Sequence, residues 1–306
     1  MVRSDRQTQS AVLDTSTDGG HEELDVQLLE QLARQALTED GAWQDVTTAA
    51  TVDPAQRGSA TVLAKRGGVI AGLPVMAAVF AMVDPATQFR PLITDGQRVR
   101  KGDHIATVEG SYAAILRAER VALNFLQRLS ATATMTAQAV AGAAGSKARI
   151  IDTRKTTPGL RYLERYAVRA GGGRNHRYNL ADGILIKDNH LAALRARGMG
   201  IPDAVRLSRE RSPHTLRVEL EVTTLDELDE GLAAGADIIL LDNMTIEQMA
   251  EAVRRCQGRA MTEASGGITP ENIAEVAGTG VDLISLGALT HSAPALDISL
   301  ELELAG

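Results

Sequence analysis

The second half of the chain repeats one pattern of hydrophobic and polar positions. Six short apolar runs end in polar or small residues, and stretches with helical spacing separate most of them. The runs are ARIIDTRK, GILIKDN, LRVELEV, ADIILLDN, AMTEASGG and DLISLGAL. This alternation predicts βαβ units whose strands are buried on both faces of a parallel sheet. Both a (β/α) barrel and a doubly wound sheet fit the pattern, and six strands rather than eight favour an open, incomplete barrel.

The first half has a different texture. Apolar residues recur at helical spacing over residues 22–37 and predict an amphipathic helix. Short β-rich runs cut by Gly, Pro and Asp cover residues 58–110 and predict antiparallel strands with turns. Residues 112–144 are rich in Ala and Leu and contain no Pro, which predicts one long helix or two consecutive ones. We therefore expect an N-terminal α/β domain, of α+β sandwich-like character, before the barrel.

These patterns predict two domains and a tail. Residues 1–20 are polar and contain no apolar run, so we expect a disordered tail rather than a signal peptide. Residues 21–130 form the expected N-terminal domain, and residues 131–289 form the open barrel with the active site. Residues 290–306 alternate like a strand, and we expect them to return to the N-terminal domain.

Composition narrows the class of partner. The formal charge of −7 offers no global attraction for a polyanion, and an aromatic content of 3% supplies few platforms for stacking bases. No window approaches the ~20 apolar residues of a membrane span. Cys256 is the only cysteine, which excludes an intrachain disulfide and a Cys-rich metal site and favours a buried thiol. We expect a cytoplasmic protein that acts on neither nucleic acid nor membrane.

Positive charge is concentrated in one segment of this acidic chain. Residues 147–187 contain ten basic residues against three acidic ones, a local charge of +7. Arg154 and Lys155 follow directly on an apolar run and should lie at the rim of the barrel, where the active sites of that fold are found. Guanidinium and ammonium groups there suit a small ligand with several negative charges. Arg161, Arg165 and Arg169 are four residues apart, and a solvated helix face explains them equally well.

Two loops and two carboxylates complete the predicted rim. Ser265-Gly266-Gly267 and Ser285-Leu286-Gly287 follow the last two runs and can expose backbone N–H groups to a phosphate. Glu221 and Asp242 end neighbouring strands, where two carboxylates suit Mg²⁺ or ribose hydroxyls. For Asp242 the alternative is a cap of the following helix. The rim has no Ser-His-Asp arrangement and no GxGxxG, so displacement at a sugar phosphate fits better than acyl or hydride transfer.

At this point the motifs become specific. DTRKTTPGLR at residues 152–161, AVRAGGGRNHR at 167–177 and LIKDNH at 185–190 closely resemble the quinolinate phosphoribosyltransferase family. The resemblance continues through ELEV, LLDN, EASGG and SLGALTHS, and backward through RAERVALNFLQRLS at 117–130 and DVTT at 45–48. Only the N-terminal tail lies outside it.

The resemblance implies a fold, an assembly and a set of site residues. Members have an N-terminal α/β domain beside an open six-stranded barrel, and they pair as homodimers in which each barrel mouth is completed by the partner. Implied quinolinate ligands are Arg120 delivered from the partner, Arg154, His176, Arg177 and Lys187. Implied ligands of phosphoribosyl pyrophosphate are Lys155, Glu221, Asp242, Ser265, Gly266, Gly267, Ser285, Gly287 and His291. For His291 helix capping is an equal alternative. Lys155, Lys187, Glu221 and Asp242 would be catalytic, with Glu221 and Asp242 also holding Mg²⁺.

The resemblance also implies the reaction. The pyridine nitrogen of quinolinate would attack C1′ of phosphoribosyl pyrophosphate, and CO₂ would leave, giving nicotinate mononucleotide for NAD synthesis. Two alternatives stay open. A relative found near molybdate transport would accept a different acid, and a silent binding protein would keep the pocket without turnover.

Overall fold

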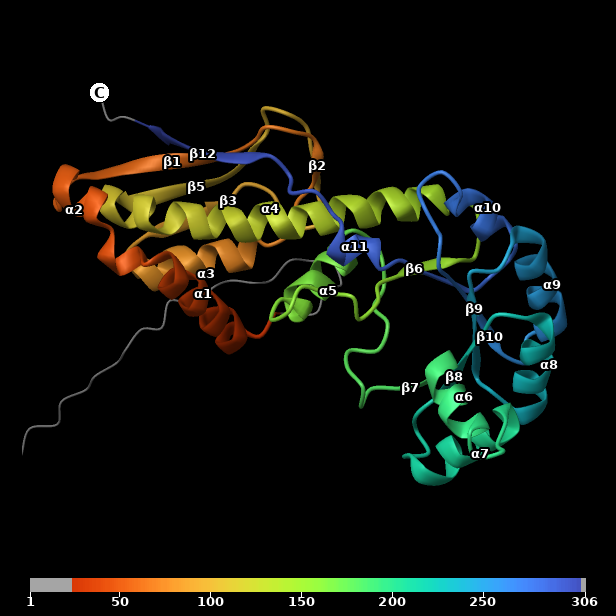
Figure 1. The fold of residues 1–306 in the computed structure, drawn as a ribbon. Coiled ribbons are helices and arrows are strands. Elements are labelled where there is room, and N and C mark those ends of the chain that lie inside the picture. Colours follow the sequence, from red (N-terminus) through yellow and green to blue (C-terminus); the bar gives the residue numbers. More distant parts are fainter. Residues whose placement is uncertain (1–23, 304–306) are drawn as a thin grey trace, which may run out of the picture.

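A computed structural model describes residues 24–303 of the chain, and Figure 1 shows an N-terminal sheet with its helices beside a second sheet covered by helices. The expected tail, residues 1–20, lies outside the described residues. No helix among residues 24–303 has the length and apolar character needed to cross a membrane.

The N-terminal sheet is antiparallel, with strand order β12-β1-β5-β3. Its strands are β1 (Arg57–Ala64), β3 (Gln88–Pro91), β5 (His104–Ser111) and β12 (Ile298–Glu303). A separate two-stranded ribbon joins β2 (Gly68–Val69) to β4 (Arg98–Val99). Strand β12 pairs with β1 so that Ser59 lies opposite Glu303. The last described strand, β12, therefore pairs with the first one, β1, although they are far apart in the sequence.

Helices cover one face of this sheet (Figure 1). They are α1 (Val26–Asp40), α3 (Leu73–Val83) and α4 (Tyr112–Gly142), with the short η1 (Ala42–Gln44) and α2 (Val46–Thr51) between α1 and β1. Asp25 caps the start of α1, and Gly41 ends it in a left-handed conformation with φ of 67°. Helix α3 lies in the region where the sequence predicted only strands. It is apolar and buried on nearly every side, so it shows no amphipathic spacing.

Helix α4 is a single helix of 31 residues that joins the two parts. Ala118 and Val121 in its first half belong to the N-terminal core, whereas Ala139 and Ala143 near its end belong to the core of the second sheet. Of the two possibilities that the sequence left open here, one long helix is confirmed.

The second sheet is parallel, with strand order β6-β11-β10-β9-β8-β7. Its strands are β6 (Arg149–Ile151), β7 (Ile184–Ile186), β8 (Val218–Val222), β9 (Ile238–Asp242), β10 (Met261–Ser265) and β11 (Leu283–Ser285). These are the six predicted runs. The sheet ends at β6 and β7, which do not pair with each other, so the barrel is open as predicted.

The remaining helices are α5 (Arg161–Ala170), α6 (Asp188–Arg195), α7 (Ile201–Arg211), α8 (Leu225–Ala234), α9 (Ile246–Cys256), α10 (Ile273–Gly278) and α11 (Ala288–His291). Helices α7 and α8 contact β8 and α9 contacts β10, whereas α5 and α11 contact α4. Cys256 is 2% exposed, and burial raises the pKa of its thiol to about 11, so the predicted buried thiol is confirmed.

Alternation along each strand separates the helix-facing side from the barrel interior. In β8, Val218, Leu220 and Val222 lie in the core beneath the helices. Glu219 and Glu221 therefore point to the opposite face, into the barrel. Strand β8 therefore has an apolar face toward the helices and a charged face toward the barrel interior. The candidate site lies on the charged face.

Candidate active site

The carboxyl ends of the parallel strands bring most of the predicted site residues to one rim. Ser265 at the end of β10 is in register with Asp242 at the end of β9. In the neighbouring β11, Ile284 is in register with Ala264, so Ser285 lies at the same level as Ser265. Glu221 is in register with Leu240, two residues before Asp242. Because parallel strands share a direction, residues far apart in the chain meet at this edge.

A cation and a carboxylate predicted for different substrates meet on this rim. Lys187 Nζ lies 3.0 Å from Glu221 Oε2, with 47% and 12% of the two side chains exposed. Asp242 Oδ2 accepts a hydrogen bond from Asn243 Nδ2 at 3.0 Å. The residue that caps helix α9 is Thr245, so the capping alternative for Asp242 is wrong and its carboxylate stays at the rim.

The glycine loops provide open backbone. A Cβ added to Gly266 would lie 2.4 Å from Asn243 Oδ1, and both Gly266 and Gly267 have positive φ angles, so other residues would be strained there. A Cβ on Gly287 would lie 2.9 Å from Lys155 Cδ and 3.2 Å from His291 Nε2. Within residues 24–303, the amides of these three glycines donate no backbone hydrogen bond. Free amides beside Lys155 and His291 suit a phosphate.

The charge of Arg154 acts on Arg177, so the two guanidinium groups belong to one cationic part of the rim. Burial lowers the pKa of Arg177, and the charge of Arg154 lowers it further, while Glu219 opposes the shift. Arg154 Nε is buried and has no hydrogen-bond partner among the described residues. A carboxylate or phosphate would offset the repulsion between these two charges, so this part of the rim favours an anion.

Comparison with known proteins agrees with this geometry. Residues 45–130 match the family model "Quinolinate phosphoribosyl transferase, N-terminal domain", and residues 132–301 match the corresponding C-terminal domain. A probable nicotinate-nucleotide pyrophosphorylase (carboxylating) of Bacillus subtilis is 43% identical over 276 residues, which cover 90% of this chain and 94% of the relative. The Mycobacterium leprae nicotinate-nucleotide pyrophosphorylase (carboxylating) is 44% identical over 275 residues, 88% of this chain and 95% of the relative.

The chain belongs to the quinolinate phosphoribosyltransferase family. Among solved structures, NadC from Streptococcus pyogenes superposes with a TM-score of 0.88 at 41% identity, covering 92% of this chain and 99% of that one. Nicotinate-nucleotide pyrophosphorylase from Francisella tularensis gives a TM-score of 0.85 at 38% identity, with 92% and 98% covered.

In this quinolinate phosphoribosyltransferase family member, an ion pair between partly exposed Arg128 and buried Glu164 holds the loop that carries Arg154 and Lys155. Arg128 of α4 lies 2.9 Å from Glu164 Oε1 and 3.0 Å from Thr157 Oγ1, and it donates to the carbonyl of Thr290. Glu164 is fully buried and also accepts the amide of Thr157 at 3.0 Å. Thr290 Oγ1 donates to the carbonyl of Lys155 at 2.7 Å. Helix α4 and α11 therefore fasten the rim loop from two sides.

The arginines of α5 fasten a second segment. Arg165 donates to the carbonyl of His176 at 2.6 Å and lies 3.5 Å from Asp152, with 13% of its side chain exposed. Arg169 donates to Asn175 Oδ1 at 2.6 Å. The alternative of a solvated helix face is therefore wrong for Arg165. Nothing in a four-residue spacing tells which way a helix faces, so the sequence could not decide this.

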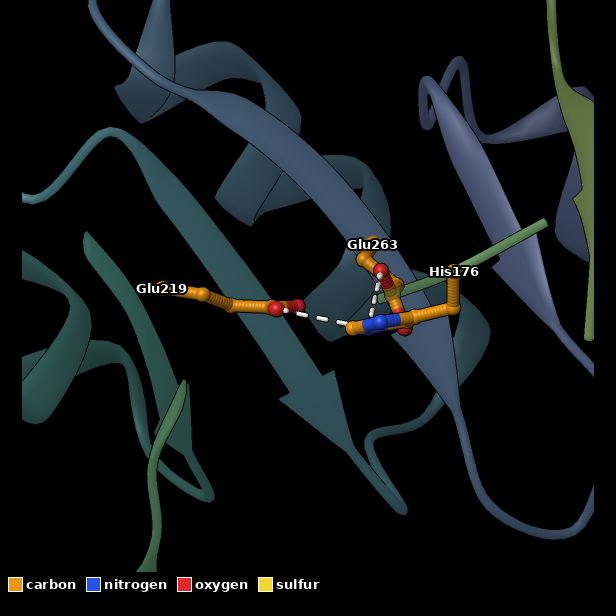
Figure 2. Close-up of side chains that lie close together, drawn as sticks. All are labelled: His176, Glu219 and Glu263. Carbon is orange, nitrogen blue, oxygen red and sulfur yellow. Dashed lines mark ion pairs between the residues drawn. The ribbon is translucent and has the colours of Figure 1, made fainter. Parts of the chain in front are cut away.

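Two predicted residues point below the rim. His176 Nε2 lies 3.3 Å from Glu219 Oε2 and 3.7 Å from Glu263 Oε2, and Figure 2 shows the imidazole between these two glutamate side chains. Ser285 is 5% exposed, and its hydroxyl lies 3.4 Å from the carbonyl of Ala264. Neither Glu219 nor Glu263 was predicted to have a role. The sequence did contain a clue to their role. Each is a glutamate in a strand expected to be buried on both faces, two residues before Glu221 or Ser265.

Arg120 lies outside this rim. It is exposed on α4, next to Val121 and Ala122 of the N-terminal core, and forms no ion pair within the described part of the chain. Arg128, through which α4 contacts its own rim loop, lies about two turns further along the helix.

Proposed function

We propose that this protein transfers the phosphoribosyl group of phosphoribosyl pyrophosphate to quinolinate with loss of CO₂, giving nicotinate mononucleotide and pyrophosphate in NAD synthesis. The observation that carries the proposal is a cluster of charges: the charge of half-buried Arg154, whose Nε has no hydrogen-bond partner among the described residues, acts on Arg177, and Lys187 pairs with Glu221 at the carboxyl ends of the strands. Family membership and the names of the relatives support it.

The cationic part of the rim would bind quinolinate. Arg154 and Arg177 match the two carboxylates of the ring in geometry and charge, and Lys187 adds a third cation. The opposite part would bind phosphoribosyl pyrophosphate. Gly266, Gly267 and Gly287 offer free amides to the 5′-phosphate, with Lys155 and His291 beside them.

Glu221 and Asp242 would hold Mg²⁺, and their chemistry fits this ion. Both carboxylates lie on neighbouring strands at the same edge and are partly exposed, so an oxygen-ligated cation can reach them. When bound, the ion neutralises charge on the departing pyrophosphate.

The side chains of the rim account for the chemistry in two stages. The ring nitrogen of quinolinate attacks C1′, and the bond from C1′ to the pyrophosphate oxygen breaks. Positive charge develops at C1′, and Glu221 with Asp242 stabilises it, while the arginines hold the ring for attack. The bond between C2 and its carboxylate then breaks to release CO₂. The electron pair stays at C2, stabilised by the cationic nitrogen beside it, until C2 takes a proton.

A second subunit would complete the site. Arg120 is exposed on α4 and would reach the quinolinate of the partner. The segments beside this half of α4 leave Trp43 and Val46 exposed by 44% and 79%, which supports a surface that another subunit covers.

The direct test follows pyrophosphate and CO₂ when purified protein is mixed with phosphoribosyl pyrophosphate and Mg²⁺. Quinolinate should release both products, and nicotinate in a parallel reaction should release neither. Pyrophosphate without CO₂ from nicotinate would move the protein to a related transferase. Quinolinate binding without turnover would make it a binding protein.

The rim itself is tested by Lys187→Ala and Arg154→Ala. Each should lower kcat/KM for quinolinate by about 100-fold, since a charge-assisted contact to the substrate is lost. Full activity in either variant contradicts the assignment.

A further inference from the structure

Two buried glutamates lie beneath the rim without an assigned role. Glu219 of β8 and Glu263 of β10 project into the barrel, with 6% and 2% of their side chains exposed. The Oε1 atom of each is buried and has no hydrogen-bond partner among the described residues. Burying two carboxylates costs several kcal/mol unless a proton or a partner neutralises them. The interior must therefore contain a compensating group.

The imidazole of His176 is that group. Its Nε2 faces Glu219 Oε2 at 3.3 Å and Glu263 Oε2 at 3.7 Å (Figure 2). On the other side of the ring, Nδ1 accepts the backbone N–H of Arg177 at 2.6 Å. An amide nitrogen can only donate, so Nδ1 carries no proton and the ring proton lies on Nε2, toward the carboxylates.

The ring is neutral in this arrangement. Burial opposes the charged form of His176, but the two glutamates outweigh it and raise its pKa. A second proton would nevertheless have to sit on Nδ1, where the N–H of Arg177 already points. We therefore assign the tautomer with hydrogen on Nε2.

A metal ion suits this cluster less well than a proton. One imidazole and two carboxylates within 4.8 Å of one another could ligate a divalent cation. However, Nε2 would have to lose its proton, and the adjoining cavity of about 550 Å³ is lined by five arginines against three acidic residues. These arginines repel a cation. The arginines are Arg149, Arg165, Arg174, Arg177 and Arg217.

A proton on Glu263 also helps to neutralise the two buried carboxylates. Burial, and next the charge of Glu219, raise the pKa of Glu263 to about 8, so this carboxyl is protonated at neutral pH. The charged and titratable groups that face it are His176 and Glu219, while β11 offers only the neutral hydroxyl of Ser285 and β9 is apolar at Leu240. The cluster then carries a single negative charge, on Glu219.

We propose that Glu219 and Glu263 are positioning residues that hold the imidazole of His176 in place, and that His176 in turn orients Arg177 to bind a carboxylate of quinolinate. This inference rests on the proposed function. Both ring nitrogens of His176 are engaged within the protein, so His176 acts through Arg177 rather than as a direct ligand of the substrate. The Arg177 side chain is held as well, because it donates to the carbonyl of Gly183 at 2.8 Å.

The test compares Glu219→Ala with Glu221→Gln, two residues further along the same strand. Losing the grip on His176 should raise KM for quinolinate at least about tenfold and leave KM for phosphoribosyl pyrophosphate unchanged, because small misplacements of a binding group are costly. Glu221→Gln should instead act on phosphoribosyl pyrophosphate. A general loosening of β8 would raise both KM values in Glu219→Ala and would overturn the proposal.

Two further measurements make the outcome decisive. Glu263→Gln keeps a neutral hydrogen-bonding group and should retain nearly full activity at pH 7. Nitrogen-15 NMR of the resting protein should show His176 protonated on Nε2, with this preference lost in Glu219→Ala. Protonation on Nδ1, or stoichiometric binding of Zn²⁺ that His176→Ala abolishes, would overturn the proposal. Because the NMR result needs no turnover, failure of the proposed function is recognised separately, by a wild-type protein that releases no product from quinolinate.

Discussion

At the scale of single residues, Gly287 shows how the backbone creates space for a phosphate. A side chain there would press on Lys155 Cδ at 2.9 Å and on His291 Nε2 at 3.2 Å. We expect Gly287→Ala to raise KM for phosphoribosyl pyrophosphate about tenfold, the effect of losing ~1.4 kcal/mol of binding. The matched control is Gly278→Ala, where a Cβ meets nothing within 4 Å and kinetics should stay at wild-type values. Equal kinetics in both variants would remove Gly287 from the site.

A second residue-scale prediction concerns stability and pH. The pKa of Glu263 is raised to about 8 in the folded protein from an ordinary value of 4.5. Between these values the folded state binds a proton that the unfolded state lacks, so this contribution to stability is present below pH 4.5 and is lost as pH rises toward 8. Thermal unfolding of wild type and Glu263→Gln should show wild type losing about 2 °C or more relative to the variant between pH 5 and 8. A constant difference contradicts the buried proton.

At the scale of elements, α4 connects the N-terminal core to the loop that carries Arg154 and Lys155. Arg128 supplies the connection through Glu164, Thr157 and the carbonyl of Thr290. Arg128→Met leaves the fully buried Glu164 unpaired and should destabilise the protein by about 3 kcal/mol, as removing one partner of a buried pair does. Chemical denaturation measures this loss.

The double variant Arg128→Met with Glu164→Gln separates the charge from the packing. It removes both charges and should recover part of the stability lost in Arg128→Met. The loop that carries Lys155 is still unfastened in both variants, so KM for phosphoribosyl pyrophosphate should be higher than in wild type in both. If stability in the double variant falls by the sum of the two single losses, the two side chains do not act as a pair.

At the scale of the whole molecule, the proposed delivery of Arg120 to the rim of a partner subunit predicts complementation between subunits. Arg120→Ala and Lys187→Ala should each be nearly inactive. In a mixed dimer one of the two sites would contain both wild-type residues. Refolding the two variants together at equal amounts should therefore restore roughly a quarter of wild-type activity, because half the dimers are mixed and each has one intact site. No recovery after verified subunit exchange would place Arg120 in its own site or outside any site.

The sequence by itself determined the order of the six parallel strands along the chain and which polar residues end them. Six apolar runs separated by helical stretches predict parallel strands, because strands of a parallel sheet are covered on both faces and are therefore apolar along their whole length. The same reasoning places Lys187, Glu221 and Asp242 at one edge, because strand ends converge whatever the packing of the helices. Motif resemblance added the identity of the family. Helix α3 was missed, since a helix buried on all sides has no period to detect.

Only the tertiary structure decided which polar groups meet below the rim and behind it. Glu219 and Glu263 are 44 residues apart in the chain and on strands separated by β9, so no local pattern joins them to His176. The pairing of Arg128 with Glu164, and the inward orientation of Arg165, likewise depend on how α4 and α5 pack. Spacing along a chain fixes which residues share an element and a face. Contacts between elements depend on packing across the fold, and those contacts position the groups that the sequence could only name.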